Sequence, residues 1–110
     1  MDIIESKKGE ILVIKGSGRL DSVTSPKFSD TVLALIDKGE KKLALDFSEL
    51  NYISSAGLRV LLMIAKRLKS IGGKVILASL QDTVKEVFEM SGFSSIFESC
   101  SNIDEALTKF

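Results

Sequence analysis

The sequence of 110 residues predicts a single α/β domain, residues 1–110, with a mixed sheet of four to five strands, a parallel core and about four helices. Short apolar runs of strand length alternate along the chain with segments whose apolar residues have helical spacing. Glycine, serine and proline separate these segments and mark turns and helix ends. The order strand, helix, strand occurs twice, and right-handed crossovers of this kind produce parallel strands.

The first part of the chain predicts a hairpin, a helix and a strand. Segments 2–5 and 10–16 are short apolar runs separated by a turn that contains Gly9, which favours an antiparallel pair. A helix follows, with Ser25 expected as N-cap, Pro26 in its first turn and Gly39 just past its end. Its apolar residues at helical spacing are Phe28, Val32, Leu35 and Ile36. Segment 41–47, KKLALDF, is then a short buried strand.

The second part continues the alternation. A helix is expected from about Ala56 to Ile71, ended by two glycines, and the strand KVILASL follows at 74–80. A third helix has Ser79 and Asp82 at capping-box spacing and ends at Gly92. Segment 95–99, SIFES, predicts a short edge strand, and Ser101 or Asn102 caps a last helix. Met63 and Met90 are expected to fill gaps in the core.

Composition and charge exclude several classes of protein. Fifteen basic residues balance fifteen acidic ones, so we expect no direct binding to nucleic acid. The longest apolar run, Val60 to Ala65, is far below the ~20 residues that span a bilayer, and the amino terminus lacks a secretory signal pattern. A cytoplasmic protein without membrane insertion is therefore expected. The chain has no histidine and one cysteine, Cys100, which argues against an enzyme, a metal site or a cofactor.

The predicted topology places a site at one edge of the sheet. If the strands at 11–16, 43–47 and 75–79 are parallel, the loops that follow them emerge together. Those loops hold Asp21, the pair Ser54 and Ser55, and residues 79–82. Asp21 is either part of this site or a turn-forming residue beside Ser22.

Two interpretations of the serine pair remain open. A hydroxyl at the N-cap satisfies a free N–H group, and this alone explains one serine. The small residues Ala56 and Gly57 suggest in addition that something approaches closely, and a helix amino terminus tolerates a phosphoryl group. If Gly57 faces a partner, Gly57→Leu should abolish binding and leave the domain folded.

Three stretches of the sequence resemble the STAS-domain anti-sigma factor antagonists. They are GSGRLDSVTSPKF, LALDFSELNYISSAGLRVLL and VKEVFEMSGFSSIF, and the resemblance that they carry extends over nearly the whole chain. The resemblance implies a STAS-like fold and a non-enzymatic regulator, monomeric when free. Such a regulator binds a serine-kinase anti-sigma factor and so releases a sigma factor, and a PP2C-type phosphatase reverses its phosphorylation.

The same resemblance identifies the site residues. It places the phosphate acceptor at Ser55, with Ser54 as second choice, because Ser54 stands where the family usually has Asp. It implies a partner-binding surface of Asp21, Ser54, Ser55, Ala56, Gly57 and Arg59. Two alternatives use the same edge of the sheet: a STAS subunit that docks constitutively on a transporter ATPase, and a sensory STAS domain that binds a small ligand.

Overall fold

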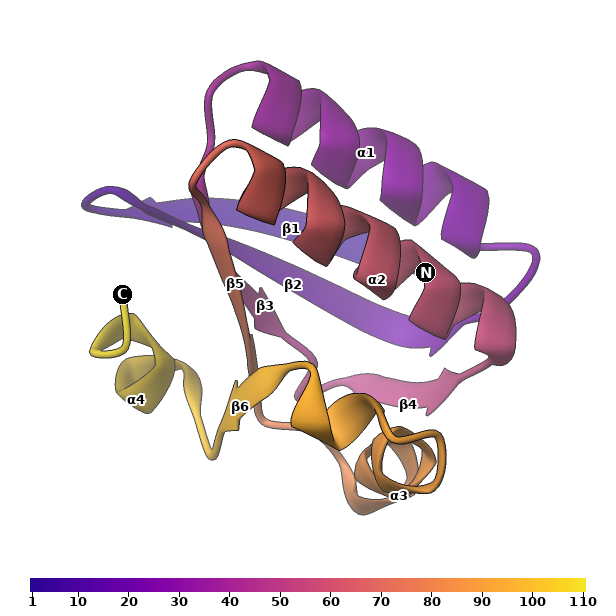
Figure 1. The fold of residues 1–110 in the computed structure, drawn as a ribbon. Helices are drawn as coiled ribbons and strands as arrows, with labels where there is room; N and C mark the ends of the chain where they lie inside the picture. Colours follow the sequence, from indigo (N-terminus) through magenta and orange to yellow (C-terminus); the bar gives the residue numbers. More distant parts are fainter.

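The β1–β2 hairpin forms one side of the sheet in the computed structural model, which describes residues 1–110 (Figure 1). Strand β1 (Asp2–Lys8) pairs antiparallel with β2 (Ile11–Leu20) over its whole length. Gly9 lies in the turn between them with φ of +63°, a conformation that residues with a Cβ adopt only at a cost. The predicted hairpin is confirmed.

The parallel core consists of β2 and three later strands. Strand β3 (Lys42–Asp46) pairs with β2 and with β5 (Lys74–Ala78), and β5 pairs with β6 (Glu98–Cys100), all in parallel. The order along this path is β1-β2-β3-β5-β6. The class predicted from the sequence, a mixed sheet with a parallel core, is confirmed, and the short edge strand near residue 97 is β6.

A sixth strand, β4 (Leu50–Ile53), was not predicted, so the sheet exceeds the expected four to five strands. It lies parallel to the second half of β2, and the register of this pair shifts between Gly18 and Arg19. Only its first and last residues, Leu50 and Ile53, are buried. Because this pattern does not alternate, the local sequence gives no strand signal, and the pairing with β2 defines the strand.

Four α-helices surround the sheet, as expected from the sequence. Helices α1 (Ser25–Asp37) and α2 (Ser55–Ser70) lie side by side over one face (Figure 1). Helix α3 (Asp82–Met90) packs against β4 and is followed by a short 3₁₀ turn, η1 (Phe93–Ser95). Helix α4 (Ile103–Leu107) contacts β5 and β6 and covers the other face of the sheet.

The helix caps differ in part from the prediction. Thr24, not Ser25, is the N-cap of α1, and Ser25 is its first helical residue. The capping box at α3 is wrong: its N-cap is Gln81, while Ser79 adopts a left-handed conformation with φ of +61°. The Ser79 hydroxyl donates instead to the Ser101 carbonyl at 3.3 Å, so a tertiary contact replaces the local one. Asn102 caps α4, as one of the two predicted candidates.

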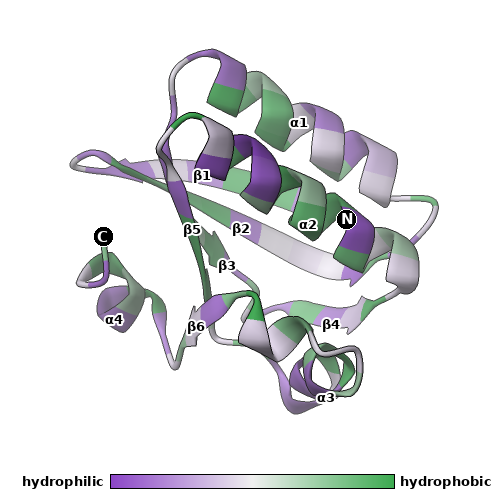
Figure 2. Ribbon diagram, viewed as in Figure 1, coloured by the Kyte–Doolittle hydropathy of each residue, from purple (hydrophilic) through white to green (hydrophobic).

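The core divides into two clusters on the two faces of the sheet. The larger contains 19 buried residues, among them Phe28, Phe47 and Phe88, each worth roughly 1.5–3 kcal/mol when fully buried. Figure 2 shows hydrophobic residues along the central strands and in alternation with hydrophilic residues along α1 and α2. The smaller cluster consists of Ile76, Ala78, Cys100 and Ala106. Met63 and Met90 belong to neither cluster and are 44% and 80% exposed, so their predicted place in the core is wrong.

Candidate functional site

The start of α2 is attached to the carboxyl end of β2. The backbone N–H of Ser54 donates to the Leu20 carbonyl at 2.9 Å, and Asp21 follows directly in the chain. The loop after β2 and the first turn of α2 are therefore neighbours, as the parallel topology predicted. The loop after β5 does not join them: Ser79 lines a separate small pocket with Ser99, Cys100 and Ser101.

Ser54 is the N-cap of α2. Its backbone is extended, its Oγ accepts a hydrogen bond from the Gly57 N–H at 3.4 Å, and its carbonyl accepts one from the Leu58 N–H at 3.0 Å. These contacts are the ones that an N-cap makes to the otherwise unpaired N–H groups of a first turn. The capping interpretation of the serine pair thus holds for Ser54.

Ser55 is the first helical residue of α2, and its side chain is exposed. Its hydroxyl makes no hydrogen bond within the chain, in contrast to that of Ser54. The partial positive charge at the amino end of α2 favours an anion at this position. Of the two serines, Ser55 therefore has the hydroxyl that a kinase could reach without breaking the helix cap.

Gly57 is buried, and the group that approaches it closely belongs to the chain itself. A Cβ built on Gly57 would lie 2.7 Å from the Leu20 carbonyl oxygen and 2.8 Å from a side-chain carbon of Ile53. Such distances force the backbone of α2 away from β2 and β4. The lack of a side chain at Gly57 thus serves the packing of α2, and we expect Gly57→Leu to destabilise the domain as well as any contact with a partner.

Asp21 forms the turn between β2 and α1. Its Oδ1 accepts hydrogen bonds from the N–H groups of Val23 and Thr24 at 3.0 and 3.1 Å, and its Oδ2 lies 3.5 Å from the Arg19 Nε. The hydrogen bond from the Thr24 N–H is the main reason that the pKa of this carboxyl falls below its ordinary value of 3.8. The turn-forming interpretation accounts for every contact of the carboxylate, and a direct contact with a partner stays a prediction.

Two exposed side chains beside this edge were not singled out from the sequence as a pair. The Arg19 guanidinium lies over the ring of Tyr52, 4.1 Å from its centroid, which is a cation–π contact between β2 and β4. The pairing depends on β4, so it could not be predicted without that strand.

Arg59 is exposed one turn after Ser55 and makes no ion pair within the chain.

A groove of about 450 Å³ runs between the first halves of α1 and α2, next to Ser55. We call it the α1–α2 groove. It is lined by Ser22, Ser25, Pro26, Ser29, Asp30, Ala56, Arg59, Val60 and Met63. Two of the predicted partner-binding residues, Ala56 and Arg59, thus share one hollow with residues of α1. The sequence signal that could have found it is the apolar Met63 on the outer side of α2.

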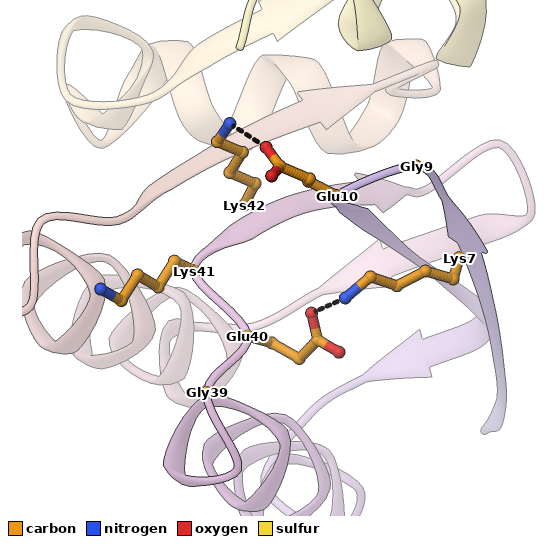
Figure 3. Close-up of a pocket in the computed structure, with 7 residues that line it drawn as sticks. All are labelled: Lys7, Gly9, Glu10, Gly39, Glu40, Lys41 and Lys42. Atoms are coloured by element: carbon orange, nitrogen blue, oxygen red, sulfur yellow. Dashed lines mark hydrogen bonds and ion pairs between the residues drawn. The ribbon is translucent and has the colours of Figure 1, made fainter.

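A second hollow lies at the opposite edge of the sheet, between the β1–β2 turn and the loop before β3 (Figure 3). No apolar side chain lines it. Lys7 pairs with Glu40, and the Lys42 Nζ donates to Glu10 at 2.9 Å, a hydrogen bond that lowers the pKa of the Glu10 carboxyl. Its acidic side chains are thus matched by lysines within the hollow.

Neither edge gathers three side chains of the metal-binding types His, Cys, Asp and Glu. No helix combines the length and the apolar character needed to cross a bilayer.

The structure is thus a mixed α/β sheet with two helices over one face and an exposed serine at the start of the second helix. The chain belongs to the STAS domain family, whose model matches residues 3–106. It is similar to BtrV of Bordetella bronchiseptica, which is assigned by name as an anti-sigma factor antagonist: 38% of 110 residues are identical, covering 100% of this chain and 95% of BtrV.

Solved structures show the same fold. A crystal structure of a Thermotoga maritima protein, assigned as an anti-sigma factor antagonist, superposes with a TM-score of 0.93 at 23% identity, over 97% of this chain and 92% of that one. The phosphorylated form of the Bacillus cell-fate determinant SpoIIAA superposes with a TM-score of 0.75 at 22% identity, over 98% of each chain. The STAS-like fold expected from the sequence is thereby confirmed.

Proposed function

We propose that this chain is an anti-sigma factor antagonist whose binding to a serine-kinase anti-sigma factor ends when that kinase phosphorylates Ser55. A PP2C-type phosphatase restores the binding form, and the chain acts in the cytoplasm as a monomer without catalysis of its own. The observation that carries the proposal is the division of work between the two serines. Ser54 is committed to the helix cap, whereas Ser55 presents an exposed hydroxyl. The similarity to BtrV along the whole chain supports the role of anti-sigma factor antagonist.

Phosphorylation of Ser55 would act on binding more than on folding. A phosphoryl group adds about −1.5 to −2 charges. At the exposed amino end of α2 this charge is favourable by ~0.3–1 kcal/mol, which is small beside a typical domain stability of ~5–15 kcal/mol. In an interface the same group must lose its hydration water and contact a surface that fits a neutral hydroxyl. We expect this to weaken binding by about 2–5 kcal/mol, the cost of a buried charge without a matching partner.

The test is incubation of the chain with ATP and the purified serine-kinase anti-sigma factors encoded in the same genome. We expect one phosphoryl group per chain, located at Ser55 by peptide mass spectrometry. Ser55→Ala should remain unmodified and still bind, while Ser55→Asp should bind weakly and melt near the wild-type temperature.

Ser54→Gly is the matched control, because glycine at an N-cap keeps the helix start at a cost of only a few tenths of a kcal/mol. This variant should still be phosphorylated. A label on Ser54, or stable binding to an ATPase without any label, would contradict the switch. The second result would instead favour the subunit that docks constitutively on a transporter ATPase.

A further inference from the structure

We propose that the α1–α2 groove receives a segment of the anti-sigma factor, which brings an apolar side chain flanked by an acidic residue that faces α2 and a basic residue that faces α1. This inference rests on the proposed function and extends the contact surface from the start of α2 to α1. Three features of the groove support it: a buried hydroxyl, a pair of opposite charges and an exposed methionine.

The buried hydroxyl belongs to Ser25. This residue is 3% exposed, and its Oγ has no hydrogen-bond partner in the chain. No other buried side-chain oxygen or nitrogen of the chain lacks a hydrogen-bond partner. Ser25 is also one of the residues that line the groove. A buried polar group without a partner is costly to a fold, so it calls for a specific explanation. A hydrogen-bonding group on a segment seated in the groove provides one.

The charges in the groove lie on its two opposite walls. Asp30 is on α1 and Arg59 is on α2, and they are the charged residues among those that line the groove. Neither takes part in an ion pair within the chain, although six other ion pairs form on the surface. A segment whose acidic residue faces Arg59 and whose basic residue faces Asp30 would form an ion pair with each wall of the groove. A segment with the two charges in the reverse order would be repelled.

The apolar part of the groove consists of Val60 and Met63 on α2 and Pro26 on α1. Met63 is 44% exposed, unlike the buried leucines on the inner side of the same helix. Methionine suits a binding surface because its flexible thioether adapts to the shape of a partner side chain. This arrangement, an apolar floor between two opposite charges, fits a protein segment better than a small anion.

Phosphorylation at Ser55 would then act on the groove through Arg59. Positions 55 and 59 are four apart on α2, which places their side chains on the same side of the helix. A phosphoryl group on Ser55 can accept hydrogen bonds from the Arg59 guanidinium. The acidic residue of the segment would lose its partner and meet a negative group in its place.

The experiment measures the affinity of the full-length chain and its variants for the anti-sigma factor of the same organism by isothermal titration. We expect Ser25→Ala to weaken binding about threefold to tenfold, the equivalent of one hydrogen bond. Arg59→Glu and Asp30→Lys should each weaken it tenfold or more, on the order expected for reversing an interfacial charge.

Lys69→Glu is the control for Arg59→Glu, because Lys69 is exposed near the far end of the same helix. We expect Lys69→Glu to change the affinity by less than about twofold, since salt screens a charge that lies outside the contact surface. Melting temperatures separate contact from folding. Ser25→Ala should melt at or above the wild-type temperature, because it removes a buried hydroxyl that has no partner.

The outcomes separate the two proposals. If the three groove variants bind as tightly as wild type while phosphorylated Ser55 abolishes binding, the groove assignment is overturned and the proposed function stands. If the wild-type chain binds no anti-sigma factor of its organism, both are overturned.

Discussion

At the scale of single residues, Ser54 shows how this chain departs from the usual family pattern without losing the helix start. The resemblance places an Asp at this position in most relatives, and Asp and Ser are both good N-caps. Ser54 accepts the hydrogen bond from Gly57 that an Asp carboxylate would accept. The substitution therefore keeps the capping role and removes one negative charge next to Ser55.

We predict that Ser54→Ala lowers the free energy of unfolding by about 1 kcal/mol, since the cap of α2 is lost. Ser54→Asp should leave it unchanged or raise it slightly, because a carboxylate caps the helix and also interacts with its dipole. Urea denaturation followed by circular dichroism measures both. Ser55→Ala is the control and should have little effect. An equal loss from Ser54→Ala and Ser55→Ala would show that Ser54 does not act as the cap.

Gly57 marks the limit of what the sequence could predict at this scale. The small residue correctly indicated that some group approaches the first turn of α2. The sequence could not say that this group is the Leu20 carbonyl, because the contact depends on how α2 packs across the ends of β2 and β4. The place of Ser55 at the start of α2, beside the loop after β2, was predicted correctly, since the helix pattern and the topology together determine it.

At the scale of elements, the start of α1 depends on Asp21. The N-cap residue Thr24 makes no capping hydrogen bond with its side chain to the first turn. The Thr24 hydroxyl donates instead to the Arg19 carbonyl at 2.8 Å. The Asp21 carboxylate accepts hydrogen bonds from the N–H groups of Val23 and Thr24. The carboxylate thus fixes the loop that connects β2 to α1. This loop lies beside the α1–α2 groove.

This arrangement predicts an acid-sensitive loop. The folded-state pKa of Asp21 lies below its ordinary value of 3.8, so ionised Asp21 stabilises the fold above that pH. The stabilisation is lost as the pH falls from 3.8 through the folded-state pKa. Asp21→Asn keeps an oxygen for the same N–H groups but cannot titrate, so its stability should fall less steeply in this window. Carboxyl NMR titration checks the pKa, and a value at or above 3.8 would contradict the assignment.

Strand β4 explains most of what the sequence missed among the elements. Strands β2, β3 and β5 of the parallel core contain continuous apolar runs, and these runs were sufficient to predict them. Strand β4 has exposed Asn51 and Tyr52 between its two buried ends, and its pairing with β2 is interrupted by a shift in register between Gly18 and Arg19. Both features depend on the assembled sheet, so the local sequence could not predict them. The cation–π contact of Arg19 with Tyr52 and the exact entry of the chain into α2 depend on the same strand.

At the scale of the whole molecule, the two faces of the sheet are covered very unequally. The 19-residue cluster joins α1, α2 and α3 to the strands, whereas the other cluster has four buried residues and is covered by α4 alone. The last strand, β6, has three residues and pairs only with β5. The carboxyl-terminal segment therefore has few apolar contacts to hold it against local opening.

We predict that amides in β6 and α4 exchange with solvent through local opening, at least tenfold faster than those in β3 and β5, which exchange only when the whole domain unfolds. Hydrogen exchange followed by NMR in increasing urea distinguishes the two processes. Exchange from β6 and α4 should respond weakly to low urea concentrations, and exchange from β3 and β5 strongly. Equal protection of all four elements would show that the smaller cluster is as stable as the larger one.

The position of Tyr52 has a spectroscopic consequence. The chain has no tryptophan and one tyrosine, so its intrinsic ultraviolet fluorescence comes mainly from a single ring. That ring lies beneath the Arg19 guanidinium, two residues before Ser54. The emission of the unlabelled protein therefore reports on the immediate surroundings of the serine pair. A tryptophan-containing partner that docks there would quench it by energy transfer, so the chain carries its own probe of complex formation.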